Sequence, residues 1–275
     1  MNELPNPTMP LSPVAWPRGS LHRPGTALAE AGAGAGISVS WARHLDEVRQ
    51  AQRLRYEIFA GEMGARLETS LAGHDIDLFD DYCEHLLVRE TTSGEVIGTY
   101  RVLTPAQASR AGSFYSDTEF DLWRLRQLRE RMVELGRSCV RADHRQGGVI
   151  LALWGALAEC MRRNGLDTMI GCASIPMLHN RVVGGDIAAS IWAQLKQTHL
   201  AAIEYHVTPR LPLPLDQLDG GLPVEPPALI KGYLRLGARV LGPPAWDPDF
   251  NTADLPMMMR IQELPPRYRK HFFGS

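Results

Sequence analysis

The sequence has no long apolar run, no paired cysteine motif and no excess of charge. No run of about 18 residues is continuously apolar, so we expect no membrane span. The N-terminus has prolines from Pro5 onward and lacks a basic segment followed by an apolar one, which argues against a signal peptide. A formal net charge of −2 gives no support to nucleic-acid binding, which usually shows as a basic surface.

The four cysteines stand far apart, in neither a CxxC pair nor a Cys/His metal spacing, and the histidines share no spacing either. We therefore expect reduced thiols, as in a cytosolic protein, and no metal site. The sequence predicts a cytoplasmic location.

A change of composition near Ile37 divides the chain. Residues 1–36 combine many prolines with a closing Ala/Gly tract and offer little apolar surface for burial. We expect a disordered tail there, because ordering such a segment costs more conformational entropy than its packing returns. Residues 37–275 are long enough for one large domain, with an additional C-terminal part from about residue 210.

Strand and helix patterns alternate from Ile37 onward. The expected order is a strand over 37–42, an amphipathic helix over 44–63, a long acidic loop over 64–84, a hairpin over 85–104, a basic helix over 119–131, a strand around Glu134, a glycine turn, a helix over 149–164, a strand over 167–176, a helix starting near Asp186, a strand over 203–209, a helix over 227–237, strands over 238–246 and 253–261, and a short helix over 265–273. This order predicts an α/β protein with a mixed sheet and helices on its faces.

The stretch from Glu134 to Leu157 suggests an anion site. An apolar strand leads into a basic glycine turn and then an apolar helix, whose first N–H groups and dipole favour a phosphate. Arg145, Gly147 and Gly148 are the candidate phosphate ligands. A plain strand-to-helix turn is the alternative explanation.

The same order of elements, with Arg145 and Gly148 in the turn, resembles the GNAT superfamily of N-acyltransferases. A set of charged and aromatic residues is similar to that of the acyl-homoserine-lactone synthases: Arg55, Phe59, Asp77, Asp80, Arg101, Glu134 and Arg137. Longer segments resemble the bacterial ornithine N-alpha-acyltransferase family: HDIDLFDDYCEHLLV, ELGRSCV, RQGGVI, IGCASI and DPDFNTADLP. They extend over nearly everything except the tail.

This resemblance implies a GNAT-like, mostly antiparallel sheet and an acyltransferase. The implied reaction moves a 3-hydroxyacyl group from acyl carrier protein to the alpha-amine of L-ornithine, giving lyso-ornithine lipid. No cofactor is implied, because the acyl-ACP phosphopantetheine thioester is itself a co-substrate. The implied partners are acyl carrier protein and L-ornithine.

The chemistry of amide formation assigns expected roles. Glu134 is the candidate general base, and Arg137 is the second candidate catalytic residue. The two could share a site only if a bulge interrupts the strand, since residues three apart otherwise face opposite ways. Asp77 or Asp80 could pair with the distal ammonium of ornithine. Arg55 or Arg101 could bind its carboxylate. Structural ion pairs are the alternative explanation for all of these residues.

Two other functions stay open at this point. One is a signal synthase that makes an acyl-homoserine lactone. The other is a non-catalytic module that binds lipid or a membrane surface through basic ends, including Arg267, Arg269 and Lys270. A peripheral contact with anionic membrane is also an expectation for the enzyme.

Overall fold

A mixed sheet forms the centre of the protein in the computed structural model, which describes residues 36–145, 148–179 and 182–274. The strand order is β1-β2-β3-β5-β6-β12-β10, with β11 beside β12. All neighbouring strands are antiparallel except β5 and β6. The strands are β1 (Ile37–Trp41), β2 (Glu84–Glu90), β3 (Val96–Leu103), β5 (Met132–Val140), β6 (Thr168–Pro176), β10 (Arg239–Val240), β11 (Ala245–Asp247) and β12 (Thr252–Arg260). The predicted mixed, mostly antiparallel sheet is confirmed. The tail expected over residues 1–36 lies, up to residue 35, outside the described residues.

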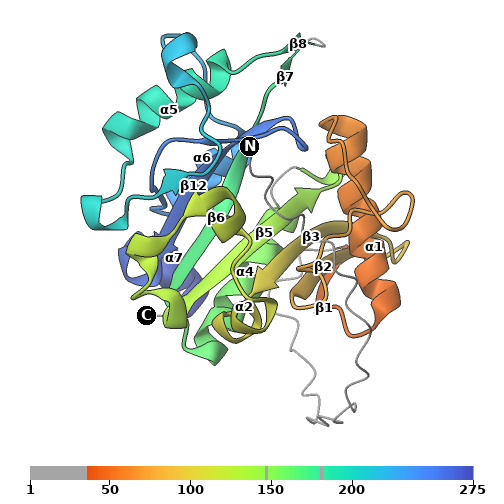
Figure 1. Cartoon of the computed structure of the whole chain (residues 1–275). Coiled ribbons are helices and arrows are strands. Elements are labelled where there is room, and N and C mark those ends of the chain that lie inside the picture. The colour runs from red at the N-terminus through yellow and green to blue at the C-terminus, as the bar shows by residue number, and fades with distance from the viewer. Residues whose placement is uncertain (1–35, 146–147, 180–181, 275) are drawn as a thin grey trace, which may run out of the picture.

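Helices cover both faces of this sheet (Figure 1). The helix α1 (Leu45–Tyr56), which continues as a π-helical turn over Glu57–Glu62, packs Leu54 and Ile58 against Cys139 of β5. On the opposite face, α4 (Gly148–Asn164) packs Val149 and Leu153 against β2 and β3. The remaining helices are α2 (Pro105–Ala111), α3 (Ser116–Glu119), α5 (Asp186–Thr198), α6 (Ala228–Arg235) and α7 (Pro266–Phe273).

The helix α4 ends as its sequence predicts. Its apolar positions recur at helical spacing, and Gly165 follows its last residue with a φ of +64°. A residue with a side chain would be strained in that left-handed conformation, so glycine ends the helix there.

The expected basic helix over 119–131 is wrong. This segment forms a short strand β4 (Phe120–Asp121), paired with β9 (Thr208–Pro209), and then two single 3-10 turns. Phe120, Leu122 and Leu125 are buried in one core cluster, a spacing that an α-helix would not place on one side. The strand expected over 203–209 is also mostly wrong, because only Thr208–Pro209 pairs. In both cases contacts between distant segments override local propensity.

The C-terminal part completes the sheet. β12 lies between β6 and β10 and pairs with β6 from Thr252↔Pro176 to Arg260↔Thr168. A second small ladder joins β7 (Leu178–His179) to β8 (Val182–Val183). Among the described residues, no helix has the length and apolar character that crossing a membrane requires.

Candidate active site

The two parallel strands β5 and β6 separate soon after they begin. In the described part of the chain they pair only from Met132↔Thr168 to Glu134↔Ile170, whereas β3 follows β5 to Val140 and β12 follows β6 to Pro176. A cavity of about 790 Å³ opens between them, and both strands line it. This volume is in the range of small-molecule binding sites. The cavity therefore passes through the plane of the sheet.

A bulge in β5 turns two candidate residues into this cavity. Arg101 of β3 pairs with Gly136, but Thr99 pairs with Cys139, so Arg137 and Ser138 together stand opposite a single residue. Arg137 has a φ of +50°, a strained value for a residue with a side chain. As a result Glu134 and Arg137 both line the cavity. The condition that the sequence set for these two residues, an intervening bulge, is confirmed.

Buried ion pairs join the acidic loop to α1 and β3. Arg55 Nε lies 2.7 Å from Asp75 Oδ2, and Arg55 Nη2 lies 2.8 Å from Asp80 Oδ2. Arg101 Nη1 lies 2.6 Å from Asp77 Oδ1 and 3.0 Å from Asp80 Oδ1. Burial by itself raises the pKa of Asp80, but the charge and hydrogen bonds of Arg55, with Arg101, hold it well below its ordinary value. These carboxylates are therefore engaged inside the protein.

Arg137 belongs to the same ion-pair network. Its Nη2 donates to Asp77 Oδ2 at 3.0 Å, and its Nε lies 3.2 Å from Asp75 Oδ2 without hydrogen-bond geometry. Its guanidinium also lies 4.9 Å from the ring centre of Tyr115 and 4.6 Å from that of Phe250. The network thus consists of three arginines and three aspartates: Arg55, Arg101, Arg137, Asp75, Asp77 and Asp80. Only its members Arg101 and Arg137 line the cavity.

Glu134 is held by hydrogen-bond donors. Its carboxylate accepts bonds from the backbone N–H groups of Tyr115 at 2.6 Å and Ser116 at 2.7 Å, and from the Ser116 hydroxyl. Burial raises the pKa of Glu134, while these donors lower it. Among the described residues, these donors hold Glu134 in place, and no ion pair does so. The carboxylate orients the start of α3 beside the cavity.

The glycine turn is described at its two ends, Arg145 and Gly148, of which Arg145 lies at the cavity. Arg145 lines it, donates from Nε to the Val140 carbonyl oxygen at 2.8 Å and pairs through Nη2 with Glu62 at 2.6 Å. Gly148 is the first residue of α4, and Gly147 lies outside the described residues. The Arg145 and Glu62 side chains are 46% and 41% exposed, so an anion could displace this pair at little cost.

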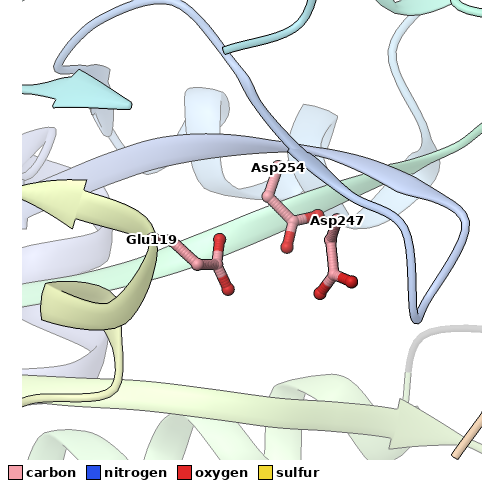
Figure 2. A group of neighbouring side chains, drawn as sticks. All are labelled: Glu119, Asp247 and Asp254. Atoms are coloured by element: carbon pink, nitrogen blue, oxygen red, sulfur yellow. The ribbon is translucent and has the colours of Figure 1, made fainter. Parts of the chain in front are cut away.

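A cluster of three carboxylates lies beside the cavity and was not predicted from the sequence. Glu119 ends α3, Asp247 ends β11, and Asp254 stands on β12 opposite Ser174 of β6. One oxygen of each carboxylate lies within 4.8 Å of the others, and the three side chains point toward one another (Figure 2). We call these three residues the acidic cluster. Its members are far apart in the sequence. The one feature of the sequence that could have pointed to the cluster is Asp254, a charged residue within an apolar strand.

The environment of the acidic cluster favours protonation or a bound cation. Burial and the charge of Asp254 raise the pKa of Glu119 well above its ordinary value. Burial and the charge of Asp247 raise the pKa of Asp254 to about 6. The cluster could hold an ammonium group or a metal ion. The sequence-based expectation of no metal therefore stays a prediction.

Comparison with known proteins identifies the family. The acetyltransferase (GNAT) domain family matches residues 54–155. The L-ornithine N(alpha)-acyltransferase of Brucella abortus is 34% identical over 251 residues, which cover 86% of this chain and 88% of the relative. The enzyme of that name from Rhodobacter capsulatus is 35% identical over 248 residues, covering 84% and 92%. The chain belongs to the L-ornithine N(alpha)-acyltransferase family. It is therefore an acyltransferase, and the non-catalytic explanation is excluded.

Solved structures confirm the family's fold. The acyl-homoserine-lactone synthase LasI matches with a TM-score of 0.52 and 13% identity, over 88% of this chain and 97% of that one. The CoA-dependent acyl-homoserine lactone synthase BjaI matches with a TM-score of 0.52 and 16% identity, over 87% and 89%. At such identities the similarity concerns the fold alone.

An acyltransferase of this family must bring an acyl thioester and an amine together. The cavity meets this need because residues from both faces of the sheet line it. Toward α4 and α6 its wall includes the apolar residues Ile150, Trp154 and Ile230. Toward α1 and α3 its wall combines apolar residues such as Phe59 with the charged residues Arg137 and Asp254. The two ends suit an acyl donor and a charged acceptor.

Proposed function

We propose that this acyltransferase moves a 3-hydroxyacyl group from acyl carrier protein to the alpha-amine of L-ornithine and forms lyso-ornithine lipid. The observation that carries the proposal is the cavity between β5 and β6, which is lined by apolar side chains of α4 and α6 and by the charged residues Arg137 and Asp254. The names of the curated relatives support ornithine as the acceptor. A different donor, such as an acyl-CoA, is the main competing assignment.

In the proposed reaction the lone pair of the alpha-amine attacks the thioester carbonyl carbon. The C–S bond then breaks, the thiol of the carrier arm leaves, and the amine proton passes to a base. An alpha-amine has an ordinary pKa near 8, against about 10.4 for a side-chain amine, so it is the amine that loses its proton more easily. The bulge at Arg137 interrupts the ladder with β3. A backbone N–H of this bulge is the donor that we propose for the developing oxyanion.

Glu134 is the proton acceptor that we propose. Its raised pKa and its place in the cavity wall suit this role. Because three donors already occupy the carboxylate, the proton would reach it through the Ser116 hydroxyl, which is one of those donors and lies 3.5 Å from Cys172 Sγ. Ser116 and Glu134 then act as one unit.

Arg137 is the proposed ligand of the substrate carboxylate. Its ion pairs use Nε and Nη2, which leaves Nη1 for the carboxylate. Arg101, which also lines the cavity, adds positive charge nearby. Arg55, Asp77 and Asp80 then support the site by holding these arginines in place.

Arg145 and the N–H groups at the start of α4, including that of Gly148, are the proposed phosphate ligands of the phosphopantetheine arm. The proposal for Gly147 in this role rests on the sequence alone. Arg145→Ala should raise the KM for acyl-ACP and leave the KM for ornithine unchanged. The control is Arg163→Ala, near the other end of α4, which should change neither value.

The experiment that tests the function uses the purified full chain with 3-hydroxyacyl-ACP, or with the matching CoA thioester, and L-ornithine. Mass spectrometry should find lyso-ornithine lipid with the ACP donor. Transfer from CoA but not from ACP would refute the donor assignment, and preferred acylation of another amine would refute the acceptor. Release of an acyl lactone from S-adenosylmethionine would favour a signal synthase instead.

A peripheral membrane contact is a further part of the proposal. α7 carries the basic residues Arg267, Arg269 and Lys270, while Phe272 and Phe273 lie beside α4 in a second, small cavity. Its cations are therefore the groups offered to anionic lipid. Co-sedimentation with vesicles of anionic lipid should occur at low salt and decrease as salt increases; equal binding to neutral vesicles would contradict it.

A further inference from the structure

The acidic cluster has no positive partner within the described ranges. None of the ion pairs there involves Glu119, Asp247 or Asp254. The three arginines of the nearby ion-pair network are already balanced by its three aspartates. Gathered carboxylates without a counter-ion are costly, so a cation must come from outside the chain or the carboxylates must be protonated.

Unpartnered oxygens in the cluster point to a ligand. Asp254 is only 4% exposed and lines the cavity, yet its Oδ1 has no hydrogen-bond partner in the described structure. Both carboxylate oxygens of Glu119 are buried and equally without a partner there. Buried polar oxygens normally accept hydrogen bonds. Leaving a buried acceptor without a donor costs more free energy than a typical hydrogen bond contributes to stability. The hydroxyls of Tyr115, Ser174 and Thr252 lie near enough to influence the pKa values of Glu119 and Asp254, yet no described donor completes a hydrogen bond to these oxygens, so they stay available to a donor from a ligand.

The geometry favours a primary ammonium over a divalent metal. An ammonium carries three N–H donors, and the cluster offers one oxygen from each of three carboxylates within 4.8 Å. Calcium or magnesium held by these three oxygens would need waters or second carboxylate oxygens to complete about six or more ligands, whereas an ammonium needs no further ligand. The cavity wall nearby also contains the rings of Tyr115 and Phe250, which suit an alkyl chain.

We propose that the acidic cluster binds the side-chain ammonium of the amino-acid acceptor. This inference rests on the proposed ornithine acyltransfer and adds to it the residues that select a diamino acid. The sequence had assigned this role to Asp77 or Asp80, whose carboxylates instead pair with arginines. Held by the cluster, the side-chain amine stays protonated and unreactive, and the alpha-amine is the free nucleophile.

Tyr115 links the two ends of this acceptor site. The guanidinium of Arg137 lies 4.9 Å from the centre of the Tyr115 ring. Burial raises the pKa of Tyr115 well above its ordinary value, and the charges of Arg137 and Glu119 act on it in opposite directions. The ring therefore lies between a cation that suits the acceptor's carboxylate and the acidic cluster that suits its ammonium. An extended amino acid would lie along Tyr115 with its alpha-amine toward β5.

The test compares two acceptors that differ only in the side-chain amine, L-ornithine and L-norvaline. The enzymes are the wild type, the amide variants Glu119→Gln and Asp254→Asn, and a surface control, Asp216→Asn. Each amide variant should raise the KM for ornithine about ten-fold or more, which is the loss of one hydrogen bond to a charged group. Turnover of norvaline should stay unchanged or increase, and the control should behave as wild type.

Calorimetry of L-ornithine binding without an acyl donor keeps the two proposals separate. Weaker ornithine binding in the amide variants supports the subsite even if the wild type acylates no ornithine, a result that would refute the proposed function alone. Equal losses with both acceptors, or an unchanged KM and affinity for ornithine, would overturn the inference. Tight binding of Mg²⁺ or Ca²⁺ that the variants abolish, with activity lost in EDTA, would overturn it in favour of a metal site.

Discussion

Asp254→Asn should make the free protein more stable at neutral and alkaline pH. Asp254 is 4% exposed and lies beside two other carboxylates, so its charged form is disfavoured in the folded state. Its pKa is raised from 3.8 to about 6. Two pKa units correspond to about 3 kcal/mol, which is the destabilisation that ionised Asp254 imposes on the fold. An amide of the same shape carries no such penalty.

The sign of the pH dependence follows from the raised pKa. Between pH 4 and pH 6 the folded state binds more protons than the unfolded state, so the free energy of unfolding of the wild type decreases as the pH rises. The variant lacks this contribution. Its advantage over the wild type should be near zero below pH 4, about 1.5 kcal/mol at pH 5 and about 3 kcal/mol at pH 8. Titrating groups away from the acidic cluster act on both proteins alike and cancel in the difference, whereas Glu119 is relieved of the Asp254 charge in the variant, which adds to the variant's advantage.

Urea unfolding of the wild type and the variant, side by side at pH 5 and pH 8, measures this difference. Asp216→Asn, which removes an exposed carboxylate, is the matched control and should change the free energy of unfolding by no more than about 0.5 kcal/mol at either pH. A variant that is less stable than the wild type at pH 8, or one with the same gain at both values, would refute the reasoning. Added L-ornithine should narrow the difference at pH 8 by about 1.4 kcal/mol at saturation, because the wild type binds it about ten-fold more tightly than the variant.

Two further predictions concern the framework of the site. Asp80→Asn removes a partner of buried Arg55 and should lower the free energy of unfolding by about 3–5 kcal/mol in urea titrations, whereas the exposed neighbour Asp81→Asn should have little effect; similar small effects would contradict the importance of the network. Gly171→Ala would place a Cβ against a β5 carbonyl oxygen and should cost about 1–3 kcal/mol by the same method, while Gly136→Ala, with open space around its Cβ, should cost much less; equal costs would show that the strands can move apart.

The resemblance to N-acyltransferases anticipated the fold and the family from local segments. The apolar helix α4 and the strands β3, β6 and β12 lie where their residue patterns predict them. Periodicity and glycine at a helix end are properties of neighbouring residues, so a single sequence carries them. The helix predicted over 119–131 was wrong because part of this segment pairs as a strand with Thr208–Pro209, far along the chain. This pairing overrides the local preference for a helix.

The acceptor site was decided by the tertiary structure. A bulge in β5 is set by how β3 pairs with it, and only this pairing turns Arg137 into the same cavity as Glu134. The sequence left open whether the aspartates of the loop bind substrate or form ion pairs. The answer depended on which arginines the fold brings near them. The acidic cluster joins residues 119, 247 and 254, and its oxygens share a space only because β12 lies beside β6. The sequence by itself determined which elements form and to which family the chain belongs, since these depend on local patterns. The chemistry of the site depends on distances between remote side chains, and those are properties of the folded chain.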